Sequence, residues 1–90
     1  LAAARARVPE VEARVTEARS RLDEARINDN AARQLQQEGF ASQSRAASTN
    51  AALKSAEAAV EAATGGLETA RAEIESAQAA VAAAQKEIER

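Results

Sequence analysis

The chain has 90 residues, of which 46% are hydrophobic and 29% charged, and its formal net charge is −2. About three residues in ten are alanine, and Phe40 is the sole aromatic residue. These small side chains cannot fill a wide globular interior, whereas alanine favours helices and lets them approach closely. The composition therefore predicts long helices that pack along a narrow seam.

Charges of both signs are interspersed along the chain, so no part of it is strongly basic or strongly acidic. Nucleic acid or an anionic membrane surface would call for a basic stripe, and the sequence has none, so we expect neither partner. No apolar run approaches the roughly 20 residues that span a bilayer, and no signal peptide is recognisable. Because the chain opens at Leu1 within a helical pattern, we expect it to be a fragment of a larger protein.

A seven-residue repeat dominates the second half of the chain. Large apolar residues recur at Leu53, Val60, Leu67, Ile74, Val81 and Ile88. Small ones follow three positions later at Ala56, Ala63, Ala70, Ala77 and Ala84. One large and one small residue per heptad is typical of a coiled-coil seam. The pattern predicts a helix over about residues 43–90.

The first half carries a matching stripe and predicts a helix over about residues 1–38. Large residues recur at Leu1, Val8, Val15 and Leu22, and the second column holds Ala4, Val11, Ala18, Ala25 and Ala32. If the chain folds back near residue 41, Val15 lies near Leu67, and the other large residues pair in the same way. Large residues would then either face each other or be offset by half a heptad, so that each packs over alanine. The two stripes thus agree on one fold-back point.

A short segment without charges, from Gly39 to Ser44, separates the two stripes. Gly39 suits the left-handed position that ends a helix, and Ser42 suits the N-cap of the next one. A turn at residues 39–42 is short enough to force the helices antiparallel. The sequence therefore predicts a single all-α domain over residues 1–90, a long two-helix antiparallel coiled-coil hairpin.

Two sites challenge continuous helices. Pro9 disfavours helical geometry at the preceding residue and lacks an N–H, so the first helix either starts at Pro9 or is kinked there. Gly65-Gly66 weakens a helix interior and would suit a second turn, which would give a three-helix bundle. Because the heptad phase is unbroken across the two glycines, we expect one continuous helix.

Catalytic chemistry has little support in this sequence. The chain has no histidine and no cysteine, so the usual general base, the activated thiol and most transition-metal ligands are missing. Neighbouring carboxylates such as Glu73 and Glu75 are expected to point into water. We therefore expect neither an enzyme nor a site for a metal or cofactor.

Asp29 and Phe40 depart from the pattern. Asp29 occupies a seam position that should be large and apolar, so either the helices splay there and the residue faces water, or a polar patch recognises a partner or fixes the register. Phe40 lies at the turn, where a hairpin has little core to receive it. It is expected either to form an exposed contact or to pack back between the helix ends.

The segment from Leu35 to Ser44 resembles the hairpin tip of the membrane fusion protein family, the HlyD/EmrA-like periplasmic adaptors. Tips of that family commonly read Arg, three residues, Leu, three residues, Gly, two residues, Ser. Leu35, Gly39 and Ser42 match, whereas the arginine position falls on Ala31 and the nearest arginine is Arg33. An acidic residue often found soon after the serine would fall at Ala47.

The resemblance implies a hairpin in the periplasm, attached to the inner membrane through segments outside this chain. Its tip would bind a TolC-like outer-membrane channel, and identical hairpins would pack side by side as a homo-oligomer. Other parts of the protein would bind an inner-membrane transporter for efflux or type I secretion. The tip residues expected to bind are Arg33, Leu35, Gly39, Phe40 and Ser42.

Two other classes of protein fit parts of the pattern. The hairpin could be a structural coiled coil of a filament, phage or cytoskeletal protein, in which the turn is only a connection. It could also be an amphipathic stress or lipid-surface protein that folds on contact, although the strict heptads and the glycine-serine turn fit that class poorly.

Overall fold

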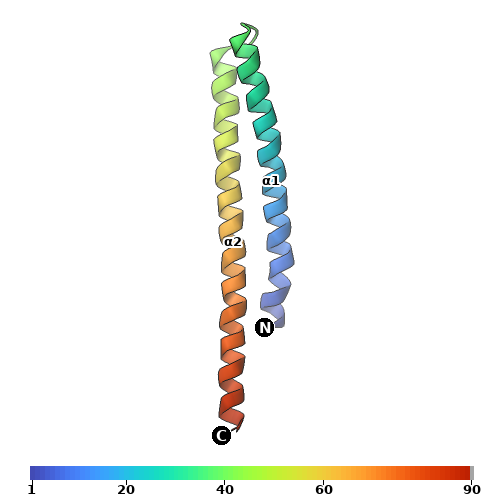
Figure 1. Ribbon diagram of the computed structural model, residues 1–90, viewed down its shortest axis with the longest axis vertical. Coiled ribbons are helices and arrows are strands. Elements are labelled where there is room, and N and C mark those ends of the chain that lie inside the picture. The colour runs from blue at the N-terminus through green and yellow to red at the C-terminus, as the bar shows by residue number, and fades with distance from the viewer. Residues whose placement is uncertain (90) are drawn as a thin grey trace.

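The computed structural model describes residues 1–89, which form two helices joined by a short turn (Figure 1). Helix α1 spans Ala2–Gln37 and helix α2 spans Gln43–Glu89. The two lie side by side and run in opposite directions (Figure 1). The predicted all-α, long antiparallel hairpin is therefore confirmed, and Arg90 of the predicted second helix lies outside the described residues.

The hairpin is a rod that measures 77 × 15 × 12 Å. Its radius of gyration is 21.3 Å, whereas a compact chain of this length would have about 12 Å. It exposes 6570 Å², against about 5,000 Å² for a compact monomer of the same mass. Much of the surface that a globular protein would bury is thus open along the sides of the rod.

The interior is a single line of side chains between the helices. Its buried hydrophobic residues are Val11, Val15, Ala18, Leu22, Ala32 and Ala70. Half-buried large residues of the predicted seam are Val8, Leu53, Val60, Leu67 and Ile74. Val81 retains 43% of its exposure and Leu1 40%, because α2 continues past the start of α1 and the seam opens there (Figure 1).

Cross-helix contacts define the register along the rod. The guanidinium of Arg7 forms an ion pair with Glu73 at 2.9 Å, near the end of the hairpin that lies away from the turn. Near the turn, the Thr49 hydroxyl donates a hydrogen bond to Asp29 at 3.1 Å. Val15 and Leu67 line the same groove between the helices, as their predicted pairing requires. The midpoints of these pairs lie between residues 39 and 41, close to the predicted fold-back point.

Helix α1 begins at Ala2 and runs through Pro9, so a helix start at Pro9 was the wrong alternative. Proline lacks the N–H that would bond the carbonyl of Arg5, four residues earlier. Arg5 is exposed and close to the helix end, where water can bond that carbonyl instead. Packing of Val8 and Val11 against α2 offsets the loss of one hydrogen bond.

Helix α2 is continuous through Gly65 and Gly66, which confirms the prediction from the heptad phase and excludes the second turn. A Cβ atom at Gly65 would meet open space, and one at Gly66 would lie 3.7 Å from Cγ1 of Val11, an ordinary van der Waals contact. Nothing in the packing of the described residues therefore requires either glycine.

Alanine at Gly65 or Gly66 is expected to stabilise the hairpin by about 0.5–1 kcal/mol each, since glycine loses more backbone entropy in a helix. Urea unfolding followed by circular dichroism measures the change. If Gly66→Ala were destabilising while Gly65→Ala stabilised, the contact with Val11 would be tighter than the structure indicates.

Candidate protein-interaction site at the hairpin tip

Helix α1 ends in a hydrogen-bonded turn of the Schellman type. The N–H of Phe40 donates to the carbonyl of Leu35 at 2.8 Å, and the N–H of Gly39 donates to that of Gln36 at 3.0 Å. This pattern requires a left-handed residue just after the helix, and Gly39 has φ of +83°. The predicted role of Gly39 in ending the helix is confirmed.

Helix α2 starts with a side-chain cap. The Ser42 hydroxyl oxygen accepts a hydrogen bond from the N–H of Arg45 at 3.1 Å, and the Ser42 carbonyl accepts one from Ala46 at 3.2 Å. A serine N-cap of this kind satisfies one of the free N–H groups at the helix start. The predicted capping role of Ser42 is confirmed, and both sides of the turn are held by specific hydrogen bonds.

Phe40 sits on this turn with 78% of its surface exposed. In a Schellman turn the residue at this position often packs its side chain back onto the helix. Phe40 does not, so packing between the helix ends was the wrong alternative. A large aromatic side chain is thus presented to solvent from a backbone held on both sides.

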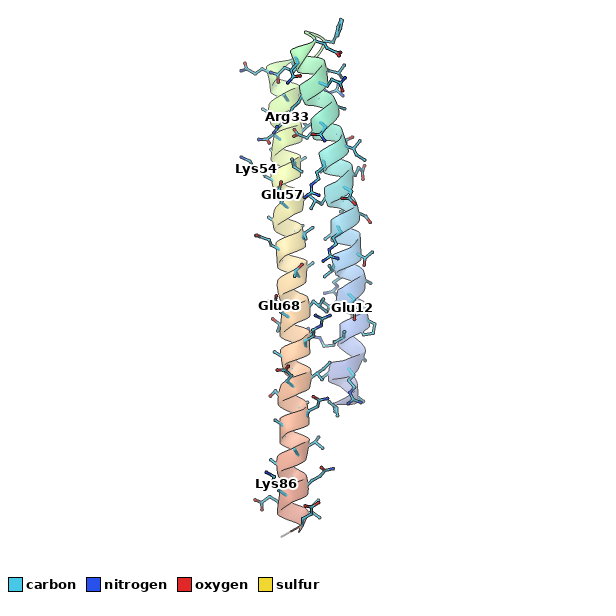
Figure 2. All side chains as sticks on the ribbon, in the orientation of Figure 1. Glu12, Arg33, Lys54, Glu57, Glu68 and Lys86 are labelled. Carbon is cyan, nitrogen blue, oxygen red and sulfur yellow. The ribbon has the colours of Figure 1, made fainter. Side chains whose placement is uncertain are left out.

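The other predicted tip residues are less free to contact a binding partner. Leu35 is half-buried. Arg33, which lies near the turn end in Figure 2, forms an ion pair with Asp29, with Nε 2.9 Å from Oδ2, and donates a hydrogen bond from Nη2 to Asn50 Oδ1 at 3.2 Å. Its guanidinium is therefore engaged within the hairpin, although 58% of the side chain stays exposed. Ala31 is exposed and offers no charge at the arginine position of the resembled motif.

No protein-family model, no curated protein and no solved structure matches the chain significantly. The assignment of the tip as a candidate site therefore depends on three features of the chain itself. These are the exposed Phe40, the turn that holds it, and the motif residues Leu35, Gly39 and Ser42.

Asp29 is buried, with 1% of its surface exposed, so the interpretation that it faces water was wrong. One carboxylate oxygen accepts from Thr49 on α2, and the other is paired with Arg33 on its own helix. Among the described residues no buried side-chain oxygen or nitrogen lacks a partner. The polar patch that the alternative interpretation expected is thus a cross-helix cluster of Asp29, Arg33, Thr49 and Asn50.

Three residues with a notable position in the structure were not predicted from the sequence. Thr49 and Asn50 complete the polar cluster, and a signal for Thr49 existed, since it stands seven residues before Ala56 in the column of small seam residues. Ile27 on α1 is 68% exposed. Because it lies five residues after the buried Leu22, helical geometry places it on the outer face, where a single exposed apolar residue is common.

A groove of about 420 Å³ follows one side of the helix junction near the polar cluster. Its walls are mostly small side chains, and Arg21 is its one charged residue. The lining residues are Arg21, Ala25, Asn28, Ser48, Thr49, Ala52, Ser55, Ala56 and Ala59. The polar side chains of this lining are those of Arg21, Asn28, Ser48, Thr49 and Ser55. Residues 1–89 also contain no cluster of acidic side chains that could hold a metal ion.

Proposed function

We propose that the chain is a protein-interaction module that works by binding and not by catalysis, with its tip as the working surface. The observation that carries this proposal is Phe40, an aromatic residue 78% exposed on a turn held by hydrogen bonds on both sides. Aromatic residues are enriched among those that dominate binding energy, and a rigid support lowers the entropy lost on binding.

The partner we propose is the helical end of a TolC-like outer-membrane channel. The hairpin would serve as the arm of a periplasmic adaptor, with identical hairpins beside it and an inner-membrane transporter bound elsewhere in the protein. A rod 77 Å long suits a part that bridges two membrane proteins. No helix among residues 1–89 is long and apolar enough to cross a membrane.

Two features support this choice of partner. Leu35, Gly39 and Ser42 match the tip motif of the adaptor family, and their positions put them at the end of α1, in the turn and at the cap of α2. Ala31 departs from the motif, so a direct guanidinium contact from that position is missing. Apolar contact through Phe40 would then supply more of the binding energy than in a tip with the arginine.

Replacing Phe40 by alanine tests the proposal. With a purified TolC-like channel as the probe, Phe40→Ala is expected to weaken binding by about 2 kcal/mol, roughly thirtyfold, as for an aromatic hot spot. Helix content should not change, because the side chain is exposed in the free hairpin. Titration calorimetry and far-ultraviolet circular dichroism measure the two effects.

The matched control is Ile27→Ala, which removes another exposed apolar side chain, on the outer face of α1 rather than at the tip. It should bind the channel as the unchanged chain does. Equal weakening by both substitutions would mean that the tip is not the contact. If the unchanged chain did not bind the channel, a structural coiled coil in which the turn is only a connection would be the better account.

A further inference from the structure

Asp29 and Thr49 are the polar exceptions in two otherwise apolar seams. From Leu1 to Ala32 the seam positions of the first helix hold Leu, Val and Ala except at Asp29. From Ala46 to Ile88 those of the second helix hold Ala, Val, Leu and Ile except at Thr49. Each of these two stretches therefore contains a single polar seam residue.

The fold brings these two residues together. The Thr49 hydroxyl donates to Oδ1 of Asp29 at 3.1 Å and also lies 3.0 Å from the carbonyl of Ala46. Arg33 pairs with Oδ2 of Asp29 and reaches Asn50 across the helix junction. Asp29 thus keeps 1% exposure while both of its carboxylate oxygens have partners.

We propose that Asp29 makes the chain fold as an antiparallel hairpin instead of assembling through parallel helices. In a parallel coiled coil, seam residues face the same residues of the second copy. Asp29 would then face Asp29 of that copy, and two carboxylates would be brought together away from water without the Thr49 hydroxyl. Two like charges that are close together and partly buried repel each other strongly, which disfavours the parallel assembly.

The rest of the sequence would allow such assembly. Both helices carry regular heptads of large and small apolar residues, which suit pairing with a copy as well as pairing with each other. A slip of one heptad that moves Asp29 towards the C-terminus of α2 would likewise set it against Ala56, which offers no hydrogen-bond donor in its side chain. Asp29 disfavours both alternatives, whatever the tip binds.

The test replaces Asp29 by valine in the 90-residue chain, with Asp29→Ala as a second variant that introduces the smallest seam residue. Asp23→Val is the matched control, because it removes the same charge from an exposed position on the same helix. Light scattering after gel filtration gives the mass across a dilution series. A spin label on a single cysteine at Ser20, an exposed position, reports whether two chains lie parallel.

The unchanged chain and Asp23→Val are expected to stay monomeric and to give no dipolar signal between chains. The Asp29 variants are expected to show a mass that rises about twofold with concentration, together with a defined distance between labels at Ser20 of two chains. That distance requires parallel copies, because antiparallel pairing would separate the two labels along the rod. Labels at Ser20 and Glu61 of one chain, two exposed positions that the register places opposite each other, must also lose their short distance, since two intact hairpins side by side would keep it. Monomers at every concentration for both Asp29 variants would overturn the proposal, as would dimers that are only antiparallel.

Discussion

Leu22→Ala is expected to lower the free energy of unfolding by about 2–3 kcal/mol, the low end of the range for a buried leucine. Leu22 is the largest buried apolar side chain of α1 and retains 8% exposure. A two-helix rod can repack little around the gap, but the seam borders solvent, which limits the size of the cavity that is left. Urea unfolding followed by circular dichroism at 222 nm measures the change.

Ile27→Ala is the matched control for Leu22→Ala, because it removes a side chain of equal size from an exposed position on the same helix. It is expected to change stability by less than about 0.5 kcal/mol. If the two variants unfolded at the same urea concentration, the seam between the helices would not be what stabilises the hairpin.

Thr49→Val is expected to destabilise the hairpin by about 1–3 kcal/mol, the range for leaving a buried polar group without a hydrogen bond. Valine has nearly the shape of threonine, so packing is kept while the donor to Asp29 is lost. Thermal unfolding of the variant and the unchanged chain gives the difference.

Thr69→Val provides the comparison for Thr49→Val. The Thr69 hydroxyl bonds the carbonyl of Gly65 on its own helix and is exposed, so its loss should change stability by less than about 0.5 kcal/mol. At a concentration too low for two chains to associate, adding Asp29→Val to Thr49→Val should recover the lost stability, because no buried polar group is then left without a partner. No recovery in the double variant would mean that the Asp29–Thr49 hydrogen bond is not the cause.

The fold could be predicted from the sequence because its stabilising contacts repeat. The heptads that run through Val15 and Leu67 determine which faces of the helices meet, and their phase also excluded a turn at Gly65-Gly66. Gly39 and Ser42 act locally, through a backbone angle and a cap within three residues. Such features depend on near neighbours, so residue type and spacing are enough to predict them.

Asp29 was less predictable because its partner is distant in the sequence. A lone carboxylate in an apolar stripe usually faces water, and only the fold-back reveals that Thr49 lies opposite to bond it. Pro9 is a related case, since burial of Val11 beside it outweighs the loss of one hydrogen bond near the helix end. In both cases contacts between the helices outweigh the local preference of one residue, that of a carboxylate for water or that of proline for a non-helical position.

Within the tip, the sequence indicated where the surface would be but not which side chains would be free. Phe40 is exposed and available, whereas Arg33 is engaged by Asp29 and Asn50. This difference shifts the proposed binding energy from a charged contact towards an apolar one. A partner with an apolar pocket among helix ends therefore fits the tip better than a purely acidic one.

The most direct test of the tip as the working surface is photocrosslinking from position 40 in the protein as it occurs in its cells. A benzophenone amino acid would replace Phe40, or Ile27 in a parallel strain, and mass spectrometry would identify the adducts. We predict adducts of an outer-membrane channel protein from position 40, and only adducts of identical copies, or none, from position 27. No channel adduct from position 40, or equal channel adducts from positions 40 and 27, would contradict the account.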